Sequence, residues 1–449
     1  MKKRTVLLPV IVICLASVAN GQEKWDLRRC VEYAWENNIS IKQSDIQARI
    51  AAVTLKQNKW AQYPTANFSN STGLQFGRSI DPTTNQFTSN QFLSQTFSLS
   101  AGFEIYNWGR ITHAITAASY EADAALADVE KNKNDIALNV ATYYLQVLLS
   151  RQQIDIARVQ MEQTRSQYQL TRKKVDAGAV PELDALSLEG QYANDSSNVI
   201  SAQATADNNL LQLKGLLNVD AGLPFDVETP PIEQIPVEPI LQLLPESVFD
   251  IAMKNQPAQK ANALRLKSLG ESSKSVRANF YPSFSVGGGL GTNFANSIKG
   301  QTFNKIWDGW GTQINTNFRQ NLGLSISVPI LNGGSAKFGY EKAKLNYKNA
   351  EITIEQTNQK LKNDIYQAYY NASAALEKYN ATQKTVSAAQ KTFDFASKRY
   401  ELGLLNIFDL LTSQNNLTKA KYDMAYARFD YVFKMKVLEF YKGLGIRLK

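Results

Sequence analysis

The side chains that most often hold transition metals or act as nucleophiles are scarce in this sequence. Its 449 residues include one histidine, His113, and two cysteines, Cys14 and Cys30. A zinc site takes three or four His, Cys or carboxylate ligands, and a Cys–His nucleophile needs both partners. We therefore expect no metal site and no catalytic cysteine. His113 is interpreted as a helix-surface residue and Cys30 as a small core residue.

Other chemistry is not indicated either. Four glycines between Gly287 and Gly291 lie on an apparent strand that leads into a loop. No helix follows closely enough to present its N-terminus to a phosphate. Nothing singles out a general acid–base pair among the 40 acidic residues. We predict that the protein is not an enzyme and has no cofactor.

Residues 1–21 have the composition of a secretory signal peptide. Met-Lys-Lys-Arg precedes an apolar run from Val6 to Val18, and small residues follow at Ala19 and Gly21. A transmembrane anchor is the alternative, but the run is shorter than the ~20 residues that span a bilayer. Cleavage after Gly21 would lower the net charge from +9 to +6 and leave one cysteine, so no internal disulfide. With no basic run interleaved with aromatics, we expect no nucleic-acid partner.

Two long stretches that lack proline predict two long helices. Residues 110–175 contain neither glycine nor proline, and residues 335–400 contain only Gly339. Apolar side chains in the first stretch recur about every 3.5 residues, which gives a helix one apolar seam. Such a helix would be roughly 100 Å long and needs neighbours along its length. Shorter helices are expected at 25–38, 39–62, 182–217 and 406–441.

Four segments alternate apolar and polar residues with a period of two, the pattern of a β-strand. The clearest alternates Phe97, Leu99, Ala101 and Phe103 with serine, glycine and threonine. We expect strands at about 63–77, 91–107, 281–294 and 318–332. Half-buried strands of a soluble sheet and strands of a membrane barrel give the same pattern. Beyond the signal peptide no ~20-residue apolar span remains, so a membrane-embedded form would be a β-barrel. Because such a barrel needs about eight strands or more, several chains would have to share one.

The chain also repeats itself. Tyr63-Pro64 recurs at Tyr281-Pro282, and Gly178 recurs at Gly403. The offsets stay close to 220 residues across helix, strand and loop, which indicates internal duplication rather than chance similarity of two coiled coils. We expect a first repeat at 22–217, a proline-rich linker at 218–245 and a second repeat at 246–449.

Further residues add to this pattern: Leu27, Ala34 and Asn37 with their echo Val248, Ala252 and Asn255, the two Tyr-Pro pairs, 328–334, 399–403, 409–411 and Gln414. With them, nearly the whole mature chain resembles the TolC-like outer membrane efflux protein family. The resemblance implies a mixed, mainly α-helical homotrimer in which each protomer gives four strands to one twelve-stranded membrane β-barrel on a periplasmic α-helical tunnel. Segments 73–92 and 292–317 would be the extracellular loops, where Trp307 and Trp310 are interface aromatics or loop packing.

The resemblance also implies functional residues at the two helix–helix turns. The periplasmic tip, which would dock an adaptor protein, comprises Gly178, Ala179, Val180 and Pro181 with Gly403, Leu404, Leu405 and Asn406. The pore constriction comprises Asp184, Asp409, Thr412 and Tyr400. In isolation the turns read as ordinary interhelical turns, and the aspartates as compensation of the helix dipole. The better-known members carry an arginine at the place of Leu405 and a second aspartate at that of Thr412. We therefore predict a less cation-selective constriction with a weaker closed-state lock.

The resemblance implies a passive exit duct in the outer membrane, with outer membrane lipid, a periplasmic adaptor (membrane fusion) protein and an inner membrane transporter as partners. Three other classes explain less. A coiled-coil surface fibre or adhesin does not account for duplicated strands, and a periplasmic enzyme lacks a site. A general diffusion porin needs far more strands per chain.

Overall fold

The computed structural model describes residues 24–80, 85–230, 235, 237–298 and 303–443, so the predicted signal peptide lies outside the described residues. The chain forms two compact units, each drawn from both halves of the sequence. One comprises Met1–Ile46, Leu126–Lys260 and Glu355–Lys449, and the other Gln47–Ala125 and Ala261–Ile354. We call them the helical unit and the sheet unit.

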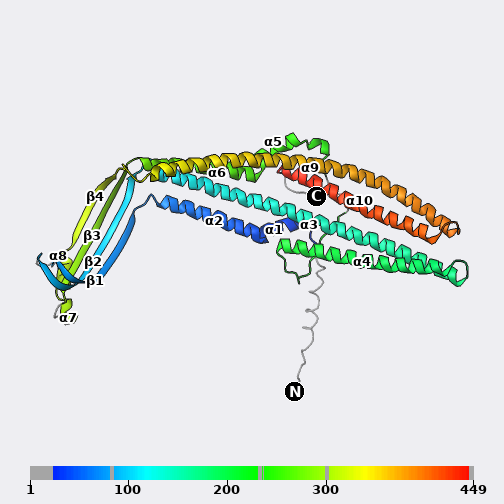
Figure 1. Ribbon diagram of the computed structural model, residues 1–449, viewed down its shortest axis with the longest axis horizontal. Coiled ribbons are helices and arrows are strands. Elements are labelled where there is room, and N and C mark those ends of the chain that lie inside the picture. The colour runs from blue at the N-terminus through cyan, green and yellow to red at the C-terminus, as the bar shows by residue number, and fades with distance from the viewer. Residues whose placement is uncertain (1–23, 81–84, 231–234, 236, 299–302, 444–449) are drawn as a thin grey trace, which may run out of the picture. The chain divides into compact units, whose positions relative to one another are not determined.

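Two helices dominate the chain. Helix α3 (Arg110–Asp176) and helix α9 (Ser335–Glu401) have 67 residues each, which confirms the predicted long helices to within one residue at their ends. In the helical unit α3 turns back into α4 (Glu182–Leu217), and α9 turns back into α10 (Ile407–Tyr441) (Figure 1). The shorter helices α1 (Leu27–Asn37) and α2 (Ile39–Trp60) also form close to the predicted bounds.

The main apolar core of the helical unit lies where α1, α3, α4 and α10 meet. Fully or almost fully buried side chains there include Val140, Tyr144, Leu148 and Leu213. Cys30 is part of this core and has no exposed surface, which confirms its interpretation as a core residue. Burial raises the pKa of the Cys30 thiol to about 12, so this thiol is unreactive at neutral pH.

In the described part of the proline-rich segment 218–245, Phe225 and Val227 belong to this core, and Leu243 belongs to a second buried cluster. Phe225, Val227 and Leu243 are buried, and Val227 forms a parallel bridge with Trp25. The buried Lys214 ammonium donates to the carbonyl oxygens of Ala221 and Leu223, at 2.6 and 2.5 Å. The segment contains one turn of 3₁₀ helix, η3 (Ile240–Gln242), and leads into α5 (Pro245–Asn255) and α6 (Pro257–Arg277), which η4 (Ala278–Phe280) follows.

The sheet unit contains one antiparallel sheet with strand order β1-β2-β3-β4. The strands are β1 (Thr65–Ile80), β2 (Phe87–Tyr106), β3 (Ser283–Ser297) and β4 (Arg319–Ser327). The expectation of a loop over 73–92 was wrong, because the ladder continues to the pair Ile80–Phe87. The predicted fourth strand was too long at its end, since Pro329 cannot donate a ladder hydrogen bond.

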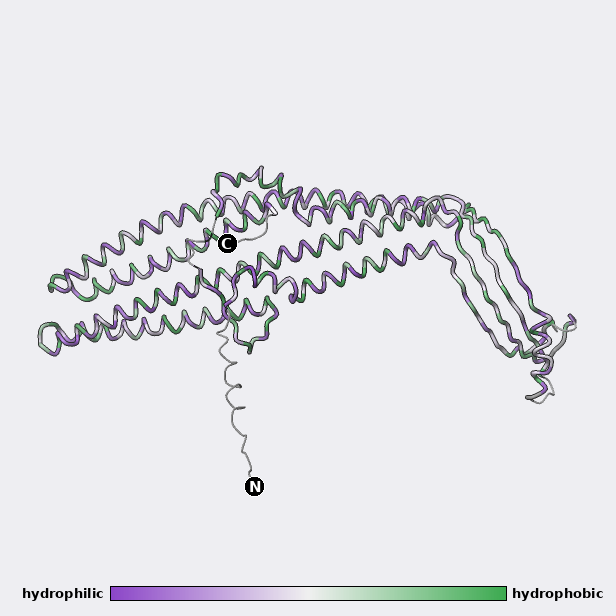
Figure 2. The backbone as a smooth tube through the Cα atoms, turned by 180° about the vertical axis from the view of Figure 1, so that it is seen from behind, coloured by the Kyte–Doolittle hydropathy of each residue, from purple (hydrophilic) through white to green (hydrophobic). Residues whose placement is uncertain are grey.

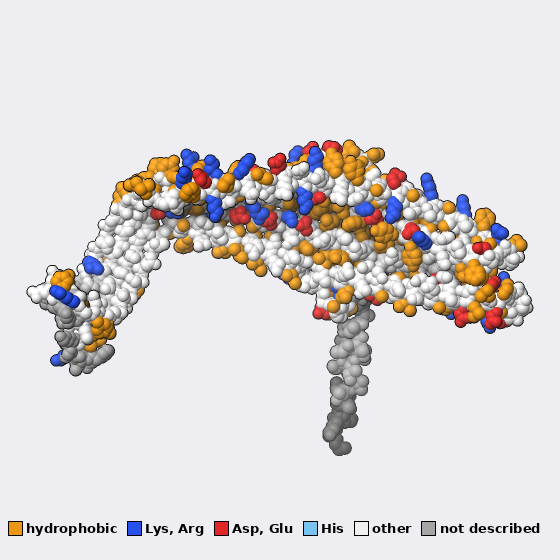
Figure 3. Space-filling model, in the orientation of Figure 1, with side chains coloured by type: hydrophobic (Ala, Val, Ile, Leu, Met, Phe, Trp, Pro, Cys, Tyr) orange, Lys and Arg blue, Asp and Glu red, His pale blue; other side chains and the backbone are white. Residues whose placement is uncertain are grey.

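The sheet has one apolar and one polar face, as the alternation predicts. Figure 2 shows hydrophobic and hydrophilic residues alternating along the strands. Leu99 pairs with Leu290, and Val286 pairs with Leu324, on the apolar face. Ser69 lies opposite Ser98 on the other face, with their hydroxyl oxygens 2.6 Å apart. Lys, Arg, Asp and Glu side chains are scattered over the helices and are scarce on the visible face of the sheet (Figure 3).

The connection between β3 and β4 packs on the apolar face of the sheet. It contains α7 (Phe303–Ile306) and α8 (Trp310–Thr316). Trp307 stacks on Phe294 at 5.6 Å, and the Trp310 indole donates to Gln95 Oε1 at 2.9 Å. The two tryptophans therefore pack the connection against the sheet. The predicted loop over 292–317 starts too early, because β3 continues to Ser297.

His113 is less exposed than a helix-surface position implies. Its Nδ1 lies 2.6 Å from Glu271 Oε2 on α6, and the imidazole is about one-third exposed. The pKa of the Glu271 carboxyl lies below its usual range. The hydrogen bond from Lys274 lowers this pKa most, burial raises it, and the contact with His113 lowers it further. The histidine thus joins α3 to α6 in the sheet unit. Among the described helices, none has a stretch both long and apolar enough to cross a membrane.

Candidate functional site at the hairpin turns

The turns of the two hairpins in the helical unit have the same backbone geometry. Gly178 and Gly403 have φ values of +72° and +70°, in the left-handed region that glycine adopts most readily. In each turn the next residue donates back over five positions, Ala179 to Lys174 O and Leu404 to Arg399 O, both at 2.8 Å. This pattern is the Schellman helix ending, so each glycine ends its long helix and starts the reversal.

The second turn exposes large apolar side chains. Leu402 is 74% exposed and Leu404 is 64% exposed, and Phe408 on the first turn of α10 is also exposed. Leu405 differs, because it packs against a cluster that includes Leu188 and Leu410. Of the predicted tip residues, Leu404 thus presents apolar surface to solvent, whereas Leu405 helps to hold the turn on the helices. At the first turn, Gly178, Ala179 and Pro181 are exposed and Val180 is half-buried.

The structure brings Tyr400 and Asp184 together, although they lie 216 positions apart. The Tyr400 hydroxyl donates to Asp184 Oδ2 at 3.3 Å. Burial, with the Asp184 carboxylate close by, raises the pKa of the Tyr400 phenol. The phenol is therefore protonated at neutral pH and remains a donor. This bond links the end of α9 to the start of α4.

Asp409 and Thr412 bond within their own helix. Asn406 is the N-cap of α10, where its Oδ1 accepts from the Asp409 amide at 2.8 Å and its Nδ2 donates to Asp409 Oδ2 at 2.7 Å. The Thr412 hydroxyl donates to Phe408 O at 2.8 Å. Both side chains are exposed. Asp409 thus has a structural role at the N-cap of α10, and its exposed side chain remains accessible to an ion in solution.

The helical unit also contains a buried group of polar side chains that the sequence analysis did not predict. Thr164 on α3, Asp195 on α4 and Gln414 on α10 are 0%, 3% and 0% exposed. In the sequence, Gln414 stands out only through the family resemblance. The signal available was on α3, where Gln160, Thr164 and Thr171 continue the spacing of the apolar seam with polar side chains. Hydrophobic periodicity does not report such positions, because it counts apolar residues only.

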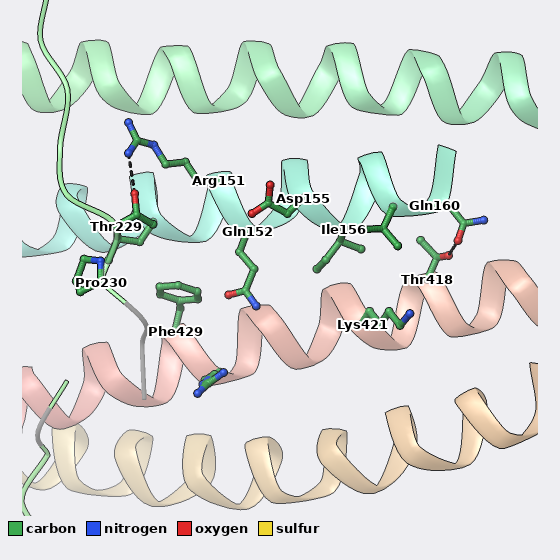
Figure 4. Close-up of a pocket in the computed structure, with 13 residues that line it drawn as sticks. Arg151, Gln152, Asp155, Ile156, Gln160, Thr229, Pro230, Thr418, Lys421 and Phe429 are labelled. Carbon is green, nitrogen blue, oxygen red and sulfur yellow. Dashed lines mark hydrogen bonds between the residues drawn. The ribbon is translucent and has the colours of Figure 1, made fainter. Parts of the chain in front are cut away.

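The helical unit has a cavity of about 460 Å³ between α3, α10 and residues 229–230. Figure 4 shows Arg151 beside Thr229, with Gln152 and Phe429 lining the same space. The guanidinium donates to Thr229 and pairs with Asp226. The Arg151 guanidinium is therefore already paired with a carboxylate, and we assign no anion site to it. The described part of the chain contains no group of three or more His, Cys, Asp or Glu side chains placed to hold a metal ion.

Comparison with known proteins places these features in context. The family model described as outer membrane efflux protein matches residues 31–219 and 248–435. Toxin and drug export protein A of Aggregatibacter actinomycetemcomitans is 21% identical over 409 residues, covering 90% of this chain and 83% of that protein. Outer membrane protein TolC of Escherichia coli (strain K12) is 23% identical over 454 residues, covering 96% and 84%.

Solved structures have the same fold. The chain resembles CusC, whose crystal structures are described in terms of folding and transmembrane channel formation, with a TM-score of 0.79 at 17% identity, covering 94% of this chain and 93% of that chain. It resembles the outer membrane protein VceC of Vibrio cholerae with a TM-score of 0.73 at 16% identity, covering 94% and 97%. At these identities the structures establish the fold of the chain.

Proposed function

The chain belongs to the outer membrane efflux protein family, and on this premise we propose how it works as an outer membrane exit duct for efflux or secretion. The duct is passive: it has no catalysis of its own, and an inner membrane transporter supplies substrate and energy. A periplasmic adaptor protein joins the two. The observation that carries the proposal is the double match of the family model, which covers most of the chain.

The working form is a homotrimer with a twelve-stranded β-barrel. The order β1-β2-β3-β4 leaves β1 and β4 each with a neighbour on one side only within the chain. An open sheet edge is not viable in lipid, and four strands cannot close on themselves. The exposed apolar face of the sheet, with Leu322 at 85% and Leu324 at 65%, would meet outer membrane lipid. Three copies that share one barrel would pair the edge strands, and lipid would cover the apolar face.

The two hairpin turns dock the adaptor. The exposed Leu402 and Leu404 support this role, because side chains on a tight, preformed turn can be covered by a partner without the cost of ordering a loop. Gly178 to Pro181 and Gly403 to Asn406 would together form the tip. Exposed Phe408 extends the apolar surface from the second turn.

Next to the tip, Asp184, Asp409, Thr412 and Tyr400 form the constriction. Three-fold symmetry would repeat Asp184 and Asp409 as carboxylate rings, which favour cations in a narrow pore. The Tyr400–Asp184 bond would help to hold the closed state, at one link per protomer. Neutral Thr412 and apolar Leu405 make the ring and the lock weaker than in the better-known members.

The two family-model matches also support the proposal that the chain arose by duplication. Residues 22–217 and 246–449 would be the two repeats, and 218–245 would be the linker between them. Each repeat would supply a pair of strands, one 67-residue helix and one hairpin.

Adaptor docking can be tested with a photo-crosslinking amino acid at position 404 in cells of the native host. Leu404 suits the probe better than Leu405, because it is exposed and its replacement leaves the cluster around Leu188 intact. The matched control carries the probe at Leu241, which is 78% exposed and lies on η3 away from the turns in sequence.

We expect the probe at 404 to capture a periplasmic adaptor and the probe at 241 not to capture it. Capture of this chain alone from position 404, under growth conditions in which the export system is active, would contradict the docking proposal. Equal capture from both positions would contradict the assignment of the tip.

A further inference from the structure

The buried seam of α3 changes its chemistry along the helix. Over Val140–Ala157 the buried side chains are mostly apolar, among them Val147 and Ile154. Further along, Gln160 and Thr164 are 7% and 0% exposed. An ordinary coiled-coil seam would be filled by apolar residues there. Polar residues at these positions therefore need a reason other than burial of apolar surface.

Three helices meet at Thr164. Its hydroxyl donates to Asp195 Oδ2 on α4 at 2.6 Å and accepts from Gln414 Nε2 on α10 at 2.8 Å. One turn away, the Thr418 hydroxyl donates to Gln160 Oε1 at 2.6 Å. We call Gln160, Thr164, Asp195, Gln414 and Thr418 the polar seam. All five lie in the helical unit, and together they join the α3–α4 hairpin to the α10 arm of the other hairpin.

The two hydrogen bonds between α3 and α10, Gln414 to Thr164 and Thr418 to Gln160, both form in the observed register. If α10 slid by one turn along α3, about 5.4 Å, Leu410 or Thr418 would take the place of Gln414 beside Thr164. The Thr164 hydroxyl would then lose the Gln414 amide as its donor, and Gln160 Oε1 would lose the Thr418 hydroxyl, which is costly away from water. A seam of apolar side chains distinguishes neighbouring registers far less, and buried polar residues are the established means of specifying one.

The polar seam is not optimised for stability alone. Within the described residues, Gln414 Oε1 is buried and has no hydrogen-bond partner. A leucine at 414 would avoid this unpaired acceptor and would suit the neighbouring Leu410 and Leu417. Keeping glutamine there is consistent with a positioning role, because the amide makes the bond to Thr164 that a leucine cannot make.

The seam also shares a helix face with the constriction. Asp195 follows Asp184 by eleven residues, close to three turns and about 16 Å along α4, so both point in nearly the same direction. Thr171, whose side chain lies near the Tyr400 hydroxyl, follows Thr164 by seven residues on α3. Setting the height of one hairpin against the other therefore also decides whether Tyr400 reaches Asp184.

We propose that the polar seam comprises positioning residues that fix the axial register of the two hairpins, and with it the alignment of their turns and of the Tyr400–Asp184 link. The inference rests on the proposed function only for the use of that alignment at the constriction and the tip. Thr164 is its centre, since it contacts both other helices. Gln160 and Thr418 add a second layer that strengthens the same register.

The register can be read directly with a short-reach diazirine amino acid at position 415 of the full-length protein in detergent. The exposed Asn415 lies beside Gln191, with Nε2 of Gln191 3.3 Å from Oδ1 of Asn415. Light-induced insertion sites are mapped by peptide mass spectrometry. The test variants are Thr164→Val, which nearly keeps the volume, and the apolar triple variant Thr164→Val, Asp195→Leu, Gln414→Leu. Thr164→Ser, which keeps the hydroxyl, is the conservative rescue.

We expect insertion at Gln191 in the unmodified seam and in Thr164→Ser. In the triple variant the share at Gln191 falls to about a third if the native register and its two one-turn neighbours are equally populated. Thr164→Val shifts the map in the same direction, and it decides the question if the triple variant does not fold. A single insertion site at Gln191 in the folded Val variants would overturn the proposal.

A matched control separates register from stability. Leu417→Ala removes buried apolar volume one turn from Gln414 and leaves all five seam residues in place. It should lower the melting temperature without spreading the insertion sites. The insertion map requires no export, so it can fail while adaptor capture at position 404 succeeds. Conversely, absent adaptor capture with the expected insertion map would remove the proposed docking and leave the register inference standing.

Discussion

Removing the Tyr400 hydroxyl is the most direct test of the constriction. Tyr400→Phe deletes the donor to Asp184 Oδ2 and keeps the ring that packs in the cluster with Leu188 and Ile407. Hydrogen bonds to charged groups contribute about 1.5–3 kcal/mol. The 3.3 Å separation is longer than usual for O–H···O, so we take about 1 kcal/mol per protomer.

That magnitude sets the expected change in channel behaviour. About 1 kcal/mol lowers the ratio of closed to open states roughly fivefold for one link, and about 150-fold if three links in a trimer act together. The assay is single-channel conductance in planar bilayers at neutral pH, where the phenol is protonated. We expect longer or more frequent open events in Tyr400→Phe than in the parent.

The control is Tyr422→Phe, which removes another interhelical tyrosine bond, from its hydroxyl to Gln153 O at 3.4 Å. It should change open events much less, because it lies away from Asp184 and the turns. Indistinguishable conductance of Tyr400→Phe and the parent would refute the reasoning, as would an equal effect of Tyr422→Phe.

Four further outcomes are expected. Asp409→Asn should lower the cation selectivity of the channel, measured as a reversal potential in a salt gradient; an unchanged potential would exclude Asp409 from the ring. Leu188→Ala should cost about 2–5 kcal/mol of unfolding free energy, because the side chain is fully buried, whereas Leu241→Ala at an exposed position should cost little. Arg151→Met should flatten the loss of stability on acidification: although burial raises the Asp226 pKa, Arg151 brings it below its usual 3.8, so the stabilisation is present above that value and is lost as pH falls through the lowered pKa. The difference in melting temperature between the variant and the parent should therefore be largest above pH 3.8 and shrink as the pH falls below that value, and a constant difference would contradict this. Gly403→Ala should lower the melting temperature, because alanine at φ +70° costs about 1–2 kcal/mol, while alanine at the helical Gly190 should stabilise or be neutral.

The two hairpin turns show which features the sequence predicts and which depend on packing between helices. Positive-φ glycines at Gly178 and Gly403 follow from the sequence, since a Schellman ending requires a left-handed residue after a long helix. The sequence does not show which leucine of the second turn faces solvent. Leu404 and Leu405 are adjacent and chemically identical, and only packing against the cluster that contains Leu188 and Leu410 makes Leu405 half-buried.

Sequence alone determined the elements and their order. Long proline-free stretches, a 3.5-residue apolar repeat and strict alternation report local backbone preference, and these predicted both 67-residue helices and all four strands. It missed the ends of strands: β1 and β2 continue through the polar segment 77–80 and 87–90 because ladder hydrogen bonds use the backbone, which carries no sequence signature.

Only the tertiary structure decided which distant side chains meet. Tyr400 and Asp184 are 216 residues apart, and Thr164 and Gln414 are 250 apart. Periodicity places each residue on a face of its own helix but not opposite a given residue of another helix, since the relative height of two helices depends on every contact between them. The buried seam around Thr164 is therefore visible only once α3, α4 and α10 are packed together.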